Sequence, residues 1–307
     1  MTTLAFLGPE GTFAHAALRL LPGADDARPV PMANVTLAID AVRAGEADGA
    51  LVPLENSVEG AVPATLDELA NGAPLVISDE VYLRVAFDLM GRAGSTVDGI
   101  RSVATHPHAE AQVRRWLMAH VPNASVALVG STAGAVQAVA AGEYDAAVGA
   151  PVAGELYGLD TLAHDIADMA GAVTRFVLLT RPAPPPPPSG NDRTSLVAYL
   201  REDHAGALLE ILTEFAARAV NLTRIESRPT KGRIGQYCFS IDCEGHIADE
   251  RVGDAVAALH RVCGDVRYLG SYPRRDGVLG PVPTGRADGD FVDARGWLER
   301  VRTSGQS

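Results

Sequence analysis

The residue whose position most calls for a chemical explanation is Arg175. Within 116–180 it is the only lysine or arginine, and it leads into the apolar stretch 176–180, which the pattern predicts to be a buried strand. A cation at the entrance to a buried strand needs an anionic partner. That partner is either an internal carboxylate, such as Glu55 or Asp168, or the anionic group of a ligand.

Polar side chains also follow another expected strand. Glu55, Asn56 and Ser57 come directly after the apolar stretch 49–53. Polar residues at the carboxyl end of a strand face the ligand crevice in α/β folds. Asparagine and serine serve turns equally well, so a capped loop remains the structural alternative.

Two strand-to-helix junctions could present backbone N–H groups to an anion, and a third carries polar side chains. Thr12 is a potential helix cap within Gly8-Pro-Glu-Gly-Thr-Phe13, and Ser131 and Thr132 occupy the same position in a second junction. In the third, Thr105 precedes a helix that carries Gln112. Each junction could equally be an ordinary capped turn.

Two histidines, His106 and His108, suggest a metal at first sight. No third Cys, His or carboxylate follows at zinc-like spacing, so we expect no metal site. The three cysteines, Cys238, Cys243 and Cys263, also lack ligand spacing, and a reduced cytoplasmic protein is the simplest explanation.

Charge is distributed unevenly along the 307 residues. Positions 1–180 hold nine basic and 21 acidic side chains, whereas 181–307 hold 17 of each, so the first part carries the entire net charge of −12. An acidic chain without a basic block is a poor candidate for binding nucleic acid or an anionic membrane. The start of the chain resembles a first strand and not a signal peptide, and no apolar run is long enough to span a membrane.

The sequence predicts no cofactor. Lys231 is the only lysine and lies outside any glycine-rich loop, which argues against a P-loop nucleotide site and leaves one candidate for imine chemistry. A dinucleotide fingerprint is also lacking.

The N-terminal part alternates short apolar runs with helical patterns, which predicts an α/β fold with mostly parallel strands. The expected strands are 4–7, 49–53, 101–104, 125–129, 146–149 and 176–180, and the expected helices are 37–44, 64–71, 109–120 and 133–141. The extended, mixed stretch 77–90 could cross between two lobes.

A proline-rich stretch at 181–193 contains five consecutive prolines and predicts a linker. The order after it, strand, helix, strand, strand, helix and strand over 194–273, is the ferredoxin-like βαββαβ plan. The tail 274–307 begins rich in Gly and Pro and ends in an amphipathic helix over 291–302, which we expect to cover a core.

At this point the motifs resemble those of the prephenate dehydratase family, in order and spacing. The catalytic-domain motifs are Gly8-Pro-Glu-Gly-Thr-Phe13, Pro53-Leu-Glu-Asn-Ser57, Thr65-Leu-Asp67, Thr105-His-Pro107, Glu155-Leu-Tyr-Gly-Leu159 and Thr174-Arg-Phe176. Gly206-Ala-Leu-Leu209 and Glu226-Ser-Arg-Pro229 resemble the two signatures of the family's ACT regulatory domain. The similarity covers about residues 3–273.

The resemblance implies a two-lobed catalytic domain over 1–180, similar to type II periplasmic binding proteins, with crossovers near 77–90 and 157–165. Prephenate would lose water and CO2 there to give phenylpyruvate. Carried over by motif, the residues implied in catalysis are Thr174, Asn56, Gln112 and Thr105. Our prediction for substrate binding combines the resemblance with the residue patterns above, and comprises Arg175, Phe176, Glu55, Ser57, Thr12, Ser131 and Thr132.

The resemblance also implies feedback inhibition by phenylalanine bound to the ACT domain. The residues expected at that effector site are Gly206, Ala207, Leu208, Leu209, Asn221, Leu222, Glu226, Ser227, Arg228 and Pro229. Binding at a subunit interface would require the chain to associate with itself, as a homodimer or homotetramer.

Two departures from the family pattern affect the expected pocket. Ala172 stands where the family often has asparagine, and His108 where it usually has glutamine. Two other functions remain open, an arogenate dehydratase and a non-catalytic amino-acid sensor built on a solute-binding fold. The intact Thr174-Arg-Phe176 motif and Asn56 argue against the sensor.

Overall fold

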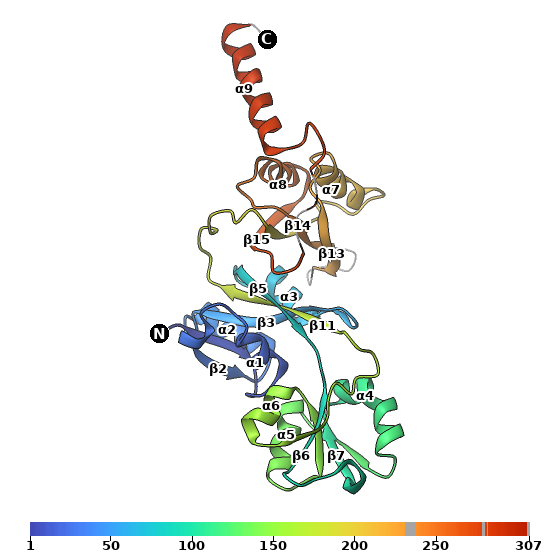
Figure 1. Cartoon of the computed structure of the whole chain (residues 1–307). Helices are drawn as coiled ribbons and strands as arrows, with labels where there is room; N and C mark the ends of the chain where they lie inside the picture. Colours follow the sequence, from blue (N-terminus) through green and yellow to red (C-terminus); the bar gives the residue numbers. More distant parts are fainter. Residues whose placement is uncertain (231–236, 278–279, 281, 306–307) are drawn as a thin grey trace. The chain divides into compact units, whose positions relative to one another are not determined.

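The computed structural model describes residues 1–230, 237–277, 280 and 282–305, and the chain divides into two compact units (Figure 1). The first unit comprises Met1–Thr65 and Val81–Leu178, and the second comprises Leu66–Glu80 and Leu179–Ser307. Lys231, the single candidate for imine chemistry, lies outside the described residues.

The first lobe of the N-terminal unit is built on a mixed sheet, in which β1 pairs in parallel with both of its neighbours and β4 pairs antiparallel with β3. Its strands lie in the order β2 (Arg28–Met32), β1 (Thr3–Leu7), β3 (Gly49–Asn56), β11 (Val173–Thr180) and β5 (Val76–Arg84), and the short β4 (Gly60–Ala61) pairs with β3. The helices of this part are α1 (Phe13–Leu18), α2 (Val35–Ala44) and α3 (Pro63–Asn71).

Local sequence explains these elements. The interior strands β1 and β3 are runs of small and apolar residues, and Leu4, Phe6 and Leu51 pack in one buried cluster. Helix α2 begins at Asn34, whose side chain accepts the Leu37 N–H, and ends at a left-handed glycine. Strand β2 contains two prolines and lies at the sheet edge, where missing N–H donors are tolerated.

The second lobe has its own five-stranded sheet. The order is β10 (Asp160–Ala163), β6 (Asp88–Gly91), β9 (Ala146–Gly149), β7 (Ser102–Thr105) and β8 (Ser125–Leu128). Its helices are α4 (Pro107–His120), α5 (Thr132–Ala140) and α6 (Pro151–Tyr157). Strands β7, β8 and β9 are parallel, so the helices α4 and α5 both start at the carboxyl ends of strands.

Two passages join the lobes. Strand β5 leaves the first sheet at Arg84, and β6 enters the second at Asp88. The return passage, which the sequence placed near 157–165, runs from the end of β10 at Ala163 to the start of β11 at Val173. Because β5 and β11 are neighbours in the first sheet, the two passages start from adjacent strands (Figure 1).

The C-terminal unit contains the expected βαββαβ fold. Its antiparallel sheet has the order β13 (Leu222–Pro229), β14 (Tyr237–Glu244), β12 (Asp192–Tyr199) and β15 (Asp265–Pro273). The helices α7 (Ala207–Ala216) and α8 (Glu250–Val262) pack on it through a core that includes Leu196, Phe215, Ile241 and Leu259. The α/β, two-lobed plus ferredoxin-like fold class predicted from the sequence is therefore confirmed.

The tail helix α9 (Asp288–Ser304) forms but does not cover a core, contrary to our expectation. None of its residues is buried, and Trp297 remains 47% exposed. Its first part packs against the start of α8, and Phe291, Ala294 and Leu298 line a groove between the two helices. Its apolar residues remain partly exposed to solvent and do not belong to the hydrophobic core.

The three cysteines are free and buried. Burial raises the pKa of Cys243 to about 12 and that of Cys263 to about 11, so neither is a thiolate at neutral pH. Among the described helices, none combines the length and the apolar character that crossing a membrane requires.

Candidate active site

A cavity of about 420 Å³ lies within the N-terminal unit. Residues of both lobes line it, and they share a pattern in which polar groups at strand and helix ends face apolar walls. The lining comprises Leu7, Gly8, Thr12, Phe13, Ala14, Ala33, Pro53, Asn56, Glu59, Val85, Phe87, His106, His108, Ala109, Gln112, Gly130, Ser131, Thr132, Thr174 and Phe176.

Asn56 and Thr174 form the polar centre of the cavity. Asn56 ends β3 and Thr174 begins β11, the neighbouring strand. The Asn56 oxygen accepts the backbone N–H groups of Val58 (2.8 Å) and Glu59 (3.0 Å), so its amide nitrogen must point the other way. That nitrogen donates to Thr174 Oγ1 at 2.8 Å. Because Thr174 accepts this bond, its own hydroxyl hydrogen is available to a ligand.

A second polar group connects the two lobes. Glu59 follows β3 in the first lobe, and its Oε1 accepts the side-chain amide of Gln112, on α4 of the second lobe, at 2.8 Å. Its other oxygen lies 3.5 Å from His108 Nδ1. Glu59 thereby joins Gln112 to the Asn56–Thr174 pair through its own backbone N–H.

Helix N-termini supply further donors. Ser131 caps α5 by accepting the Gly134 N–H at 2.9 Å, and Thr12 caps α1 by accepting the His15 N–H. Thr12 also donates its hydroxyl to Leu7 O at 2.8 Å. The positive end of the α5 dipole and its unpaired N–H groups favour an anion beside Ser131 and Thr132.

The histidines are the only basic side chains among the described lining residues. His106 caps α4, its Nδ1 accepts the His108 N–H at 3.3 Å, and the two rings stack with centroids 5.5 Å apart. Burial, and then the charge of His108, lower the pKa of His106, so it is mostly neutral near pH 7. With Nδ1 accepting a hydrogen bond, its proton resides on Nε2.

Seven of the residues predicted for catalysis or substrate binding line the cavity, namely Thr12, Asn56, Gln112, Ser131, Thr132, Thr174 and Phe176. Four others are not among the described lining residues. Thr105 is fully buried and donates to Val148 O at 3.0 Å, which fixes the end of β7 to β9. Ser57 is bonded to both backbone groups of Val173, through its Oγ and its N–H, each at 2.9 Å.

Arg175 and Glu55 occupy positions that alternate with the cavity residues. Side chains of successive strand residues point to opposite faces, so Arg175, between Thr174 and Phe176 on β11, belongs to the other face. It is 4% exposed. Glu55 precedes Asn56 on β3 and pairs in register with Ala61 of β4. Direct substrate contacts of Arg175 and Glu55 stay predictions.

The sequence reasoning did not find Glu59, His106 as a wall residue, or the aromatic pair Phe13 and Phe87. The two phenylalanines meet edge to face with centroids 5.2 Å apart, one from each lobe. Glu59 lies in the same strand-end stretch as Asn56, a signal that could have identified it. No local pattern marks the phenylalanines as cavity residues, because apolar residues usually indicate core.

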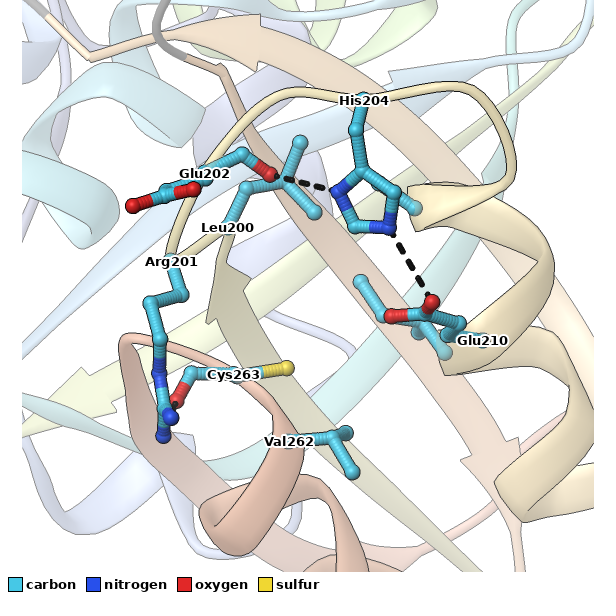
Figure 2. A pocket seen from close by; sticks show the side chains of 9 residues that line it. Leu200, Arg201, Glu202, His204, Glu210, Val262 and Cys263 are labelled. Atoms are coloured by element: carbon cyan, nitrogen blue, oxygen red, sulfur yellow. Dashed lines mark hydrogen bonds and ion pairs between the residues drawn. The ribbon is translucent and has the colours of Figure 1, made fainter.

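The C-terminal unit has a smaller cavity of about 210 Å³ beside the start of α7 (Figure 2). Its apolar side is formed by Leu200, Ala207, Ile211, Val262 and Cys263, and its polar side by Arg201, Glu202, His204 and Glu210.

The polar side is ordered by hydrogen bonds. Arg201 donates to the carbonyls of Arg261 and Cys263, and His204 pairs with Glu210 at 3.0 Å and with the Glu202 carbonyl at 3.2 Å. The hydrogen bond that Glu210 accepts from His204 raises the pKa of His204.

The residues predicted for an effector site are distributed over two elements. Gly206 begins α7 in a left-handed conformation (φ 97°), Ala207 lines the small cavity, and Leu208 and Leu209 are exposed. The others lie before or on β13, whose residues alternate between intermediate and exposed. Asn221 accepts the Glu244 N–H through its carbonyl, and Leu222, Glu226, Ser227, Arg228 and Pro229 all pair with β14 or flank those pairs.

Comparison with known proteins finds close relatives over the whole chain. The profile of the prephenate dehydratase family matches residues 4–184, and that of the ACT domain matches residues 194–261. A prephenate dehydratase of Amycolatopsis methanolica is 50% identical over 308 residues, with 100% of each chain covered. One of Mycolicibacterium vanbaalenii is 48% identical, covering 98% of this chain and 99% of the relative.

A solved structure resembles this chain equally well. The crystal structure of prephenate dehydratase from Arthrobacter aurescens, in complex with L-Phe, superposes with a TM-score of 0.92 at 47% identity. The match covers 99% of this chain and 100% of that one.

Proposed function

The chain belongs to the prephenate dehydratase family, and from this we infer that its N-terminal cavity converts prephenate to phenylpyruvate with loss of water and CO2. The observation that carries the proposal is the Asn56–Thr174 hydrogen bond at the strand ends. In this bond Thr174 is the acceptor, so its hydroxyl hydrogen can donate to a ligand in a cavity that also has apolar walls.

In the reaction the substrate's ring C–O bond breaks and the bond to its ring carboxylate breaks. The electron pair of the second bond completes the aromatic ring, and the departing hydroxide takes a proton to become water. Thr174 donates a hydrogen bond to that leaving oxygen, and this lowers the barrier by stabilising developing negative charge. A threonine hydroxyl is too weak an acid to give up its proton fully, so hydrogen bonding is its role.

Binding of the substrate's two carboxylates rests on local groups, because the N-terminal part of the chain is strongly acidic. The α5 N-terminus at Ser131 and Thr132, with the His106 Nε2–H, offers donors on one side of the cavity, and Thr12 lines it with its hydroxyl hydrogen bonded to Leu7 O. Phe13, Phe87 and Phe176 provide an apolar surface for the ring that becomes aromatic. Gln112 supplies a further donor from the second lobe.

Phenylalanine is the proposed effector, and the C-terminal unit is its proposed receptor. Supporting this, the similar enzyme from Arthrobacter aurescens was solved with L-Phe. The small cavity beside α7 combines an apolar side with Arg201, His204 and Glu210, a lining that suits an amino acid with an apolar side chain (Figure 2). A homodimer or homotetramer in the cytoplasm is part of the same proposal.

One assay separates the candidate functions. Purified protein is given prephenate or arogenate, and the aromatic product is measured with and without phenylalanine. We expect phenylpyruvate from prephenate and inhibition by phenylalanine. Turnover of arogenate alone would identify an arogenate dehydratase, and phenylalanine binding without turnover of either substrate would identify a sensor.

A further inference from the structure

Residues 66–80, here called the inserted segment, fold with a part of the chain that is distant in sequence. They lie in the middle of the N-terminal sequence, yet they belong to the compact unit formed by residues 179–307. The segment contains most of α3 and the first five residues of β5. Both elements therefore begin in one unit and end in the other.

The first half of the inserted segment is bound by two arginines of the C-terminal sheet. Arg228, on β13, donates to Asp67 Oδ1 from Nη2 at 2.7 Å and from Nε at 3.1 Å. Arg267, on β15, donates to the carbonyls of Leu69 (2.9 Å) and Gly72 (2.7 Å). Such carbonyls at a helix C-terminus lack partners within the helix, so a charged donor is a strong replacement.

The middle of the segment approaches the sheet backbone closely. The Tyr199 hydroxyl of β12 donates to the Ala70 carbonyl. Gly270 of β15 has φ +130°, and a Cβ placed on it would lie 2.3 Å from the carbonyl oxygen of Ile77. Only glycine permits this approach of two backbones.

The far end of the segment is held by buried charges. Arg193 of β12 is 2% exposed and pairs with Glu80, which is fully buried, and with Asp276 at 2.8 Å. Arg275 pairs with Asp79 at 2.8 Å, and its backbone N–H donates to Glu80 at 3.0 Å. The segment is thus fixed at its start, middle and end.

Both ends of the segment lead directly to the cavity. Immediately before it, the Thr65 hydroxyl donates to the carbonyl of Pro53 at 2.6 Å, and Pro53 lines the cavity three residues ahead of Asn56. After it, β5 continues to Val85, another lining residue, whose N–H donates to Ala172 O at 2.7 Å. Ala172 is two residues from Thr174.

We propose that Arg228 and Arg193 are positioning residues for the reaction. These arginines hold residues 66–80 on the C-terminal sheet. They thereby set the positions of the two parts of the cavity wall that adjoin the start and the end of the segment. A ligand that changes the C-terminal sheet acts on turnover through this segment. The inference that phenylalanine acts through this segment rests on the proposed function, whereas the positioning role of the two arginines requires only turnover of prephenate.

The family resemblance places Arg228 among the residues of the phenylalanine site, and that assignment stays a prediction. In the structure its guanidinium is already bound to a carboxylate of the inserted segment. The pair Arg228–Asp67 is also the better one to test. Its side chains are 20% and 23% exposed, whereas Arg193–Glu80 is buried and belongs to a larger network, so breaking it would disturb several interactions at once and endanger folding.

The test is a charge swap read by hydrogen exchange and by turnover. Asp67→Arg and Arg228→Glu each place like charges together, so we expect faster amide exchange in residues 66–80 and a fall of about tenfold in kcat/KM. The double variant Asp67→Arg/Arg228→Glu restores the pair, and both quantities should return to within about threefold of the original protein. Arg218→Glu is the control, because Arg218 pairs with Glu214 and Asp254.

Phenylalanine titration of the same proteins tests the regulatory step. Asp67→Arg should bind phenylalanine in calorimetry with an unchanged Kd, yet lose most of its inhibition, and the double variant should regain it. Full inhibition of Asp67→Arg, or unchanged exchange and turnover in both single variants, would overturn the inference and leave the proposed function standing. If the original protein turns over prephenate but binds no phenylalanine, the proposed regulation fails, while exchange and turnover still decide the positioning role.

Discussion

At the scale of single residues, the cavity is organised by which atom donates and which accepts. Asn56 has its oxygen committed to two backbone N–H groups, which fixes its amide toward Thr174. This orientation follows from the neighbouring residues Val58 and Glu59 and not from the ligand. The Thr174 oxygen is therefore held by the protein itself, as we expect of a group proposed to stabilise a leaving group electrostatically.

The first prediction concerns Thr174. Removing its hydroxyl in Thr174→Ala should lower kcat by about 10²–10³-fold, in the range for loss of one donor to developing negative charge. Thr174→Ser keeps the hydroxyl and should retain activity within about tenfold of the original protein. Steady-state kinetics with prephenate measures both. Near-full kcat in Thr174→Ala would exclude this assignment.

The second prediction concerns Glu59, which accepts the amide of Gln112. Glu59→Gln keeps an acceptor oxygen and should be milder than Glu59→Ala, which frees the Gln112 side chain. If Glu59 acts by orienting Gln112, the two residues are coupled, and Glu59→Ala should cost about fivefold less in a Gln112→Ala background. A double-mutant cycle on kcat/KM measures this, and strictly additive effects would show that Glu59 acts independently.

At the scale of elements, sequence patterns located most helices and strands because each carries local signals. The βαββαβ order after the linker and the strand ends at Asn56 and Thr174 could be predicted from apolar runs and polar flanks. Strand β2 could not, since its two prolines argue against a strand and only its edge position accommodates them. Likewise, nothing in the composition of α9 distinguishes a helix that covers a core from one that lies along a neighbour.

The cavity could be predicted only in part, because some of its features leave no local pattern in the sequence. Asn56 and Ser131 follow strands, so they could be grouped by this position before the structure was known, whereas Thr174 was assigned through its family motif. The face on which Arg175 lies depends on the exact start of β11, and one residue of register reverses it. The approach of residues 66–80 to the C-terminal sheet depends on contacts between residues more than 100 positions apart, which leave no local pattern.

The third prediction concerns the closeness of β15 and β5. Gly270→Ala combines an unfavourable φ of +130° with a Cβ 2.3 Å from the Ile77 oxygen, so it should reduce the free energy of unfolding by about 2 kcal/mol or more. Gly206→Ala is the matched control, since Gly206 has φ +97° but nothing within 4 Å of its added Cβ. Urea unfolding of both variants separates the clash from the conformational strain. Equal losses would mean that the two backbones are not in contact.

At the scale of the whole molecule, charge is used differently by the two parts of the chain. The N-terminal sequence carries the whole net charge of −12, whereas the C-terminal sequence is balanced and places several of its arginines in ion pairs. We therefore expect long-range electrostatics to oppose the approach of the proposed dianionic substrate, and its recognition to depend on donors inside the cavity. Stability of the C-terminal unit, in contrast, depends on carboxylates remaining ionised.

The fourth prediction is a loss of stability in acid that depends on Asp276. Burial raises the pKa of this carboxyl, but the hydrogen bond from Arg274 and the charge of Arg193 outweigh burial and bring the pKa below its ordinary value. A carboxyl with a lowered folded-state pKa stabilises the protein above its unfolded pKa of about 3.9, and this contribution disappears as pH falls through the folded value.

The measurement is the free energy of unfolding of the original protein and of Asp276→Asn between about pH 3 and pH 7. The original protein should be more stable at neutral pH, and the difference should shrink as the pH drops below about 4. A difference that stayed constant across this range would mean that the charge of Asp276 contributes nothing. Arg218→Gln, which alters ion pairs elsewhere in the same unit, controls for general acid sensitivity.

The inserted segment has a consequence for how such proteins can be recombined. A proline-rich linker suggests that the regulatory domain could be exchanged between relatives by cutting there. Residues 66–80 would then stay with the original N-terminal sequence but would pack against a C-terminal sheet from another protein. Asp67 and Glu80 would have lost Arg228 and Arg193, and a foreign side chain in place of Gly270 would obstruct Ile77. We therefore expect these distant positions to covary among relatives. A working chimera would need residues 66–80, fifteen residues within the N-terminal sequence, to be exchanged together with the C-terminal half.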